Sequence, residues 1–360
     1  MAMKLEDLLR RAVDASASDV HLKVGAPPCM RIDGELRRME DLDTLKPGDT
    51  EAYAQVIFTQ KAANDFKTFG EADFAYGRQD LGRFRVSAFR QRGSLSLVMR
   101  HVVPGVPTLE RLGLPTIAKR LASETRGLLI VSGSSGSGRT TSAAGIVEHI
   151  NGSRPVSIVT IEDPIEILFP DKMAIVAQRE IGVDVADFAS GIRRATRQNS
   201  DVIMVSEISD RETAAAALAA AETGHLVIAT MHTSDPVETV GRFIGFFPAD
   251  QQRLVRIQFA SQLVGIIAQV LVDSVSGGTR ALATEILVGT PKVEELIASA
   301  APREDYLEMI KDSTFTGMQS FDQSLFGLVQ AGRVSVQNAL LYARSSHEFR
   351  AKAMEAGIDG

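Results

Sequence analysis

The chain has 360 residues, 44% hydrophobic and 23% charged, a composition typical of a soluble globular protein large enough for two domain cores. Its formal net charge is -6, so the chain lacks the overall basic character of nucleic-acid-binding proteins and no nucleic-acid partner is expected. A single cysteine, Cys29, excludes an intrachain disulfide and a four-cysteine zinc site, and fits a reducing cytosol.

Neither the N-terminus nor the longest apolar stretch predicts a membrane segment. Charged residues interrupt the first 25 positions throughout, so no signal peptide is expected. The stretch "LVGIIAQVLV" at 263–272 is about half of the ~20 residues that a membrane-spanning helix needs. The sequence therefore predicts a cytoplasmic protein without direct membrane insertion, which would reach a membrane through a partner.

Residues 1–102 predict a small α+β domain. Helical spacing appears over Leu5–Val13 and over 51–69, and Asp33–Gly34 indicates a hairpin turn. Alternating apolar and polar residues predict strands at 19–24, 72–77, 82–93 and 94–102. Residues 103–115, with three prolines, are predicted to be the linker to a second domain.

From residue 116 onward, apolar strands alternate with helices, which predicts a parallel sheet with helical crossovers. Apolar runs that read as strands occupy 127–133, 156–163, 201–207 and 225–233. The segments 140–150 and 211–224 read as helices, and the chain is mostly helical from about 290. The expected fold class is therefore α/β, with a parallel-sheet domain following the small α+β domain.

The stretch "VSGSSGSGRTTS" at 131–142 joins a predicted strand to a predicted helix. It fits the phosphate-binding pattern G-x-x-x-x-G-K-[ST], except that Arg139 takes the lysine position. Glycines let the backbone amides and the helix N-terminus surround a phosphate, and Thr140 offers a hydroxyl to Mg²⁺. The alternative is a plain Gly/Ser turn. The candidate nucleotide-binding residues are Gly133, Ser134, Ser135, Gly136, Ser137, Gly138, Arg139, Thr140 and Thr141.

Acidic residues follow two of the predicted strands, and histidines flank a third. "TIEDPIE" ends in Glu166, and "DVIMVSE" ends in Glu207. Acids at the carboxyl ends of parallel strands lie beside the ligand crevice of such sheets. His225 and His232 enclose an apolar strand, and their odd spacing places them on opposite faces unless one lies at a strand end. Solvated strand caps and hydrogen-bonded core histidines are the alternatives.

In this order and spacing, the segments resemble the hexameric secretion-motor ATPases, and specifically the pilus-retraction branch of the PilT and PilU type. The resemblance spans nearly the whole chain, and several segments look more like the PilU variety. It is carried by the glycine loop and by "SDVHLKVGAPPCMRIDGEL", "GRFRVSAF", "IEDPIE", "AETGHLVIATMHT", "FFPAD" and "GMQSFDQSL". It implies a PAS-like N-terminal domain at 1–102, a RecA-like nucleotide-binding domain at 116–289 and a C-terminal helical subdomain at 290–360.

The resemblance also implies roles for the acids and histidines, with ATP and Mg²⁺ as ligands. Glu166 matches the catalytic glutamate that polarises the attacking water. Glu207 matches the Walker B acid, which helps to hold Mg²⁺ through water. His225 and His232 match the paired histidines that sense the γ-phosphate region.

Arg85 and Arg100 match the arginines that the N-terminal domain presents to the nucleotide from across the subunit cleft. A guanidinium offers a rigid fork of donors to the charge on a transferring phosphoryl group. The alternative is a solvated sheet face, as for Arg83, Arg90 and Arg92. The implied partners are five further copies in a homohexamer, a paralogous retraction ATPase and the inner-membrane platform protein of the pilus, to which the ring would be peripheral.

The sequence departs from the family pattern near the nucleotide. Arg139 replaces the loop lysine, Ser206 a glycine and Ser209 an arginine, and the retraction-branch helix motif resembling AIRNLIRE is not visible. Two interpretations stay open: a hexameric ATPase that drives pilus retraction and twitching motility, or an accessory ring with weak or no hydrolysis that assists a competent paralogue. A DNA-translocating motor is a more remote alternative, which the acidic balance disfavours.

Overall fold

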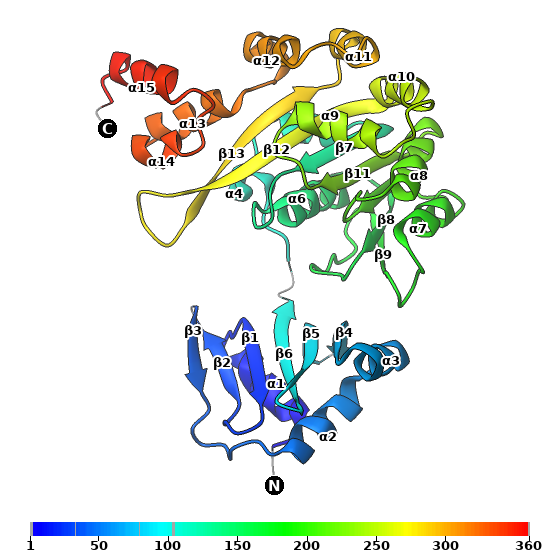
Figure 1. The fold of residues 1–360 in the computed structure, drawn as a ribbon, viewed down its shortest axis with the longest axis vertical. Coiled ribbons are helices and arrows are strands. Elements are labelled where there is room, and N and C mark those ends of the chain that lie inside the picture. Colours follow the sequence, from blue (N-terminus) through cyan, green and yellow to red (C-terminus); the bar gives the residue numbers. More distant parts are fainter. Residues whose placement is uncertain (1–2, 33, 79, 103–104, 359–360) are drawn as a thin grey trace. The chain divides into compact units, whose positions relative to one another are not determined.

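A computed structural model describes residues 3–32, 34–78, 80–102 and 105–358 and groups the chain into two compact units (Figure 1). Unit 1 comprises Met1–Gly105 and Pro164–Leu168, and unit 2 comprises Val106–Asp163 and Phe169–Gly360. Asp33 of the predicted hairpin turn and residues 103–104 of the predicted linker lie outside the described residues. The remainder of that linker segment includes a short helix, α4 (Leu109–Leu112).

Unit 1 contains a six-stranded sheet in which every neighbouring pair is antiparallel, in the order β3-β2-β1-β6-β5-β4. Its strands are β1 (Asp19–Lys23), β2 (Cys29–Ile32), β3 (Glu35–Arg38), β4 (Glu71–Arg78), β5 (Gly82–Gln91) and β6 (Ser94–Val102). Along β5, Phe84, Val86 and Ala88 are buried, while the alternate residues are less so. This alternation buries one face of the sheet, as the sequence pattern predicts.

Three helices complete unit 1: α1 (Leu5–Asp14), α2 (Pro47–Ile57) and α3 (Gln60–Phe69). The helical character predicted over 51–69 is confirmed except at Phe58 and Thr59, where α2 ends and Thr59 becomes the N-cap of α3. The Thr59 hydroxyl accepts from the amide of Ala62 and so satisfies a free donor of the new helix. Leu8 and Leu9 of α1 are fully buried in the same core as the sheet residues.

Unit 2 contains a seven-stranded sheet in the order β13-β12-β7-β11-β10-β8-β9. All neighbouring pairs are parallel except β12 with β13. The strands are β7 (Gly127–Ser132), β8 (Ser157–Glu162), β9 (Ile175–Glu180), β10 (Val202–Val205), β11 (Leu226–Met231), β12 (Leu263–Asp273) and β13 (Arg280–Val288). Every residue of β7, β10 and β11 is buried, so both faces of the sheet centre are covered, as in other parallel sheets. The predicted α/β fold class is confirmed.

Helices connect and cover these strands. They are α5 (Ile117–Ala122), α6 (Arg139–Ser153), α7 (Phe188–Ala195), α8 (Arg211–Glu222), α9 (Pro236–Gly245) and α10 (Gln252–Gln262). The helix α6 follows β7 through the glycine loop, and α9 follows β11 through residues 232–235. Both connections leave the sheet at the carboxyl ends of adjacent strands, so the two loops lie side by side.

The C-terminal part of unit 2 is helical, as predicted. It comprises α11 (Pro291–Ala298), α12 (Arg303–Asp312), the 3-10 turn η1 (Thr314–Thr316), α13 (Phe321–Gln330), α14 (Val336–Leu340) and α15 (Ser346–Glu355). Leu325 and Phe349 of these helices share a buried cluster with Ala268 and Val272 of β12. Throughout the part of the chain that the structure describes, no helix combines the length and the apolar character needed to cross a membrane.

Candidate functional site

The phosphate-type loop lies between β7 and α6, as the sequence predicts. Gly136 and Gly138 have φ angles of 77° and 88°, a left-handed conformation that strains other residues, and Gly138 is the N-cap of α6. The amides of the first helical turn have no partner within the helix, so they are free to bind an anion. Thr140 and Thr141 are half-buried in that first turn.

Gly133 is the tightest point of the loop. A Cβ atom at this position would collide with Ser137 Oγ and lie 2.6 Å from the carbonyl oxygen of Gln269. Ser137 Oγ and Gln269 Oε1 are buried and have no hydrogen-bond partner within the described ranges. A buried hydroxyl without a partner is rare in native proteins and fits a loop that takes up a polar ligand or water.

Arg139, which takes the lysine position, folds back onto the protein. Its Nη1 atom donates to the carbonyl of Gly133 at 2.6 Å and to the carbonyl of Met231 at 3.1 Å. Its Nη2 atom lies 2.7 Å from Nε2 of His232. Burial lowers the pKa of the Arg139 guanidinium, and the nearby Glu207 carboxylate partly offsets that effect. Arginine stays protonated in proteins even so, and it therefore bridges the loop and the end of β11 as a cation.

This contact positions the His232 imidazole beside the loop. Because a guanidinium can only donate, Nε2 of His232 is the acceptor in a hydrogen bond with Arg139. Glu207 Oε2 is 3.6 Å from the same nitrogen, too far for a hydrogen bond. The Glu207 side chain remains 38% exposed, and its oxygens can accept from a metal-bound water.

The two histidines are not brought together. His225 precedes β11 and His232 follows it, so the six-residue strand separates them by roughly 20 Å. His225 Nδ1 lies 3.1 Å from the carbonyl of Ala220 in α8, at the end of the sheet opposite the loop. Of the pair, His232 is the one that the structure places beside Arg139 and Glu207.

Arg85 and Arg100 lie in unit 1, directly opposite each other on β5 and β6. Arg85 Nη1 is 3.5 Å from Oε1 of Glu166 in the segment Pro164–Leu168, which groups with the same unit. Arg100 Nε donates to Asp19 at 2.9 Å, and the arginine side chain stays 68% exposed. The two arginines therefore share a sheet face but have different acidic partners.

The acids of "IEDPIE" separate in the structure. Glu162 is the last residue of β8 and is buried, and its Oε1 accepts from Thr160 at 2.6 Å and from Gln178 at 3.0 Å. Glu166 lies in the following segment, with its side chain 43% exposed. A buried acid with two hydrogen bonds suits a structural role, whereas the partly exposed Glu166 is accessible to a water molecule.

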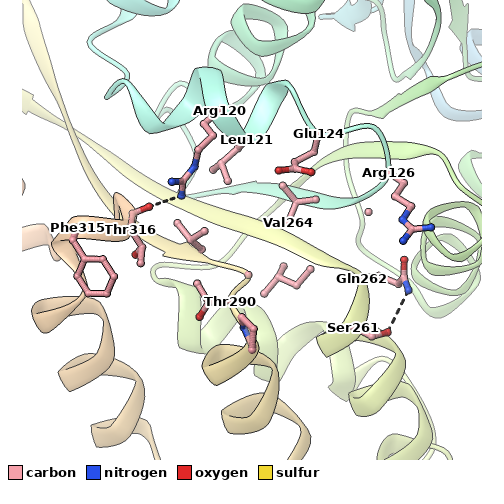
Figure 2. A pocket seen from close by; sticks show the side chains of 15 residues that line it. Arg120, Leu121, Glu124, Arg126, Ser261, Gln262, Val264, Thr290, Phe315 and Thr316 are labelled. Carbon is pink, nitrogen blue, oxygen red and sulfur yellow. Dashed lines mark hydrogen bonds between the residues drawn. The ribbon is translucent and has the colours of Figure 1, made fainter.

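A cavity of about 610 Å³ opens at the other end of the unit 2 sheet, beside the first residue of β7 and the start of β12 (Figure 2). Arg120, Arg126 and the exposed Phe315 line it, and Arg120 donates to the carbonyl of Thr316. The phosphate-type loop leaves the opposite end of β7, so this cavity is not part of that site. A smaller cavity of about 260 Å³ does border the loop, at Ser134.

Sequence reasoning missed the residues on the far side of that smaller cavity, chiefly Asp235 and Arg344. The dipeptide Asp235–Pro236 carries a signal that could have been used, because Asp before Pro is a typical helix start. Two arginines reach Asp235 from distant parts of the chain: Arg303 is 68 positions away, and Arg344 is more than a hundred positions away. Nothing in the sequence indicates these pairings.

Comparison with known proteins shows which protein family the chain resembles. Residues 2–348 match the family model described as Type II/IV secretion system protein. The chain is 38% identical to the type IV pilus retraction ATPase PilT of Pseudomonas aeruginosa, over 96% of this chain and 100% of that protein. It is also 38% identical to the type IV pilus ATPase PilU of the same organism, over 97% of this chain and 91% of PilU. A crystal structure of the pilus retraction motor PilT with bound ADP matches with a TM-score of 0.87 and 37% identity, covering 96% of this chain and 98% of that one.

The expected bias toward PilU is not visible in overall identity, which is the same for both relatives. The match is nevertheless continuous from the antiparallel sheet of unit 1 to the C-terminal helices. The chain therefore belongs to the Type II/IV secretion system proteins and, within them, to the secretion-system ATPases of the PilT and PilU family.

Proposed function

We propose that this protein is a hexameric motor that binds and hydrolyses ATP to drive type IV pilus retraction. The observation that carries the proposal is the junction of the glycine loop, Arg139, His232 and Glu207 at the carboxyl ends of β7, β10 and β11. The names of the two relatives at 38% identity support the pilus as the substrate of the motor. The protein would work in the cytoplasm, attached to the inner membrane through the pilus platform protein.

The loop residues suit the phosphates of ATP. Backbone amides of the loop other than that of Ser137, which donates to the carbonyl of Ser134, would donate to the phosphate oxygens, since left-handed glycines shape the loop and α6 begins there. The hydroxyl of Thr140 and the carboxylate of Glu207 are oxygen ligands of the kind that Mg²⁺ and its waters prefer. Bound Mg²⁺ would neutralise charge that develops on the phosphate oxygens.

Glu166 is the proposed catalytic carboxylate, and it would accept a proton from the attacking water or orient it. Arg85, 3.5 Å from Glu166, would hold that carboxylate and offer its remaining donors to the transferring phosphoryl group. Arg100 would act on the same charge, and its exposed side chain leaves donors free beyond the bond to Asp19. His232 would sense the γ-phosphate through its contact with Arg139. For His225, its place at the far end of β11 supports a structural role instead.

Arg139 also favours a second candidate function. Its guanidinium already donates to two carbonyls and an imidazole, so phosphate oxygens must compete with protein acceptors for it. A planar fork cannot occupy the same place between two phosphates as a lysine ammonium. An accessory ring with weak hydrolysis, which assists a competent paralogous motor, is therefore the alternative.

Steady-state ATP turnover in Mg²⁺ tests the proposal on the purified full-length protein. We expect slow turnover that Arg139→Lys raises by about tenfold, because a compact ammonium restores the ordinary phosphate contact. Glu166→Gln should lower turnover by about a hundredfold, because the amide cannot accept the proton.

Matched controls lie in the cavity at the far end of the sheet. Arg126→Lys and Glu124→Gln make the same chemical changes at exposed positions away from the loop and should leave turnover unaltered. Turnover of the unmodified protein no higher than that of Glu166→Gln would exclude the motor and leave the accessory ring. Binding of ADP by calorimetry would still be expected in that case.

A further inference from the structure

Asp235 occupies a junction beside the nucleotide site. It follows His232 by three positions and is the N-cap of α9, where its Oδ1 accepts from the amide of Glu238 at 2.9 Å. Its side chain is only 9% exposed. A buried carboxylate costs free energy unless cations or several donors surround it, so its partners matter.

Two arginines from the C-terminal part of unit 2 supply that compensation. Arg303, the first residue of α12, donates from Nη2 to Asp235 Oδ2 at 2.6 Å and from Nη1 to Oδ1 at 3.4 Å. Arg344, just before α15, lies 3.8 Å from the same carboxylate and donates through Nε to Glu285 of β13 at 3.1 Å. Burial tends to raise the pKa of Asp235, but the bonds from Arg303 and Glu238 outweigh it and hold the pKa below its usual value.

The same junction is bonded to the strand that leads into the phosphate loop. Thr239 of α9 bridges the carbonyl of Asp235, at 2.7 Å, and the hydroxyl of Ser132, at 3.2 Å. Ser132 is the last residue of β7 and directly precedes Gly133. Asp235 and Arg344 also border the small cavity that reaches Ser134 of the loop. Asp235 therefore contacts the C-terminal part of unit 2 through its carboxylate and the loop framework through its backbone carbonyl.

We infer that Asp235 and Arg303 are positioning residues for ATP hydrolysis. They fix the β11–α9 connection, so that His232 stays within reach of Arg139, and they make the C-terminal helices responsive to the nucleotide. The inference rests on the proposed function for its effect on turnover. The structural link to α12 is independent of hydrolysis and has a readout of its own.

Three variants of the full-length protein test the link. Arg303→Met keeps the aliphatic stem but loses both bonds to Asp235. Asp235→Asn keeps the N-cap, since asparagine is as good a cap as aspartate, but loses the charge. Each should lower kcat by about fivefold and change KM for ATP by less than about twofold, because the loop amides that bind phosphate are retained. The double variant should be no slower than either single variant, because both remove the same contact.

Two controls separate positioning from general stability. Arg350→Met alters an exposed arginine of α15 and should behave as the unmodified protein. Arg303→Lys should recover part of the lost kcat through one remaining bond. Additive losses in the double variant, or a kcat of Arg303→Met equal to that of Arg350→Met, would overturn the inference.

Hydrogen exchange distinguishes a failure of the link between Asp235 and Arg303 from a failure of the proposed function. ADP at saturating concentration should slow exchange in peptides that cover α12 in the unmodified protein and in Arg350→Met, but not in Arg303→Met. If no variant turns over ATP and this pattern still appears, hydrolysis fails as a function while the link stands. Equal protection of α12 in Arg303→Met and in Arg350→Met would refute the link.

Discussion

At the scale of single residues, the Arg139 guanidinium donates to two backbone carbonyls and one imidazole at the mouth of the loop. Hydrogen bonds from a charged donor contribute about 1.5 to 3 kcal/mol each in proteins, so this arrangement holds the loop in one conformation. A lysine could reach fewer of these acceptors at once, because its donors share one nitrogen. We therefore expect Arg139 to offer fewer hydrogen bonds to a phosphate than a lysine would, because its donors already serve protein acceptors.

Gly133 gives a prediction at this scale. Gly133→Ala should lower the affinity for ADP by at least about tenfold, because a methyl group would displace Ser137 or Gln269 and reshape the loop. Titration calorimetry with ADP measures the change. Gly152→Ala near the end of α6 is the matched control, since nothing lies within 4 Å of the added methyl group, and it should bind ADP as before. Unchanged affinity in Gly133→Ala would show that the loop does not close on phosphate here.

The residues of the site differ in how far the sequence could predict them. The loop, Glu207 and His232 were expected together, because a local pattern and the order of parallel strands fix their neighbourhood. The role expected for His225 stays a prediction. Both histidines lie just outside β11, at its opposite ends, so strand alternation does not apply to them. The partners of Asp235 could not be predicted, because ion pairs between distant segments leave no local pattern.

At the scale of elements, a row of charges crosses the unit 1 sheet. Arg31 of β2, Asp19 of β1, Arg100 of β6 and Arg85 of β5 are successive cross-strand neighbours. Asp19 lies between two arginines, at 3.6 Å from Arg31 and 2.9 Å from Arg100, with its side chain 7% exposed. Burial raises the pKa of Asp19, but hydrogen bonds from Ser18 and Arg100 outweigh it, so the net pKa is below its usual value.

A pH dependence of stability follows from this row. Because the pKa of Asp19 is lower in the folded than in the unfolded chain, its contribution is complete above the unfolded pKa of about 3.9 and disappears as pH falls through the folded pKa. Asp19→Asn should therefore cost about 1 to 2 kcal/mol at pH 7 and much less near pH 3. Scanning calorimetry of both proteins across this range measures the difference. A cost that stays constant with pH would contradict the charge-based explanation.

The elements themselves were largely predictable, because strand alternation and buried apolar runs are local signals. The exception at 51–69 has a physical cause. Neither Gly nor Pro marks the break at Phe58. The second helix begins with Thr59, whose hydroxyl binds the amide of Ala62, and a threonine inside a helical pattern is only a weak signal of such a break.

At the scale of the whole molecule, two units with separate cores carry different parts of the proposed site. The phosphate loop belongs to unit 2, whereas Arg85, Arg100 and Glu166 belong to unit 1. In a ring, each group could act on the nucleotide of its own subunit or of a neighbour. The contact between Arg85 and Glu166 within one chain supports a shared site for these two.

Mixed rings test this assignment. Pure Arg85→Ala, Arg100→Ala and Glu166→Gln proteins should each be nearly inactive. Mixing Arg100→Ala with Glu166→Gln should restore activity if Arg100 acts across the subunit boundary, with about a quarter of the sites complete after random mixing. Mixing Arg85→Ala with Glu166→Gln should restore none, because no site then has both groups. Differently tagged subunits verify that the rings are mixed, and activity in the second mixture would place Arg85 across the boundary as well.

The pairing of β12 with β13 has a mechanical consequence. The two strands run antiparallel from Gly265 opposite Val288 to Asp273 opposite Arg280, and the C-terminal helices continue from the Val288 end. A pull on that end alone would load the interstrand bonds one after another, which is the weakest way to stress a strand pair. Glu285 lies inside this strand pair, and its carboxylate is bonded to Arg344 and to the amide of Phe321. A force on the C-terminal helices is therefore also applied to β13 at Glu285, away from the Val288 end. The load is thereby shared, and the C-terminal helices can transmit tension without peeling away from the sheet.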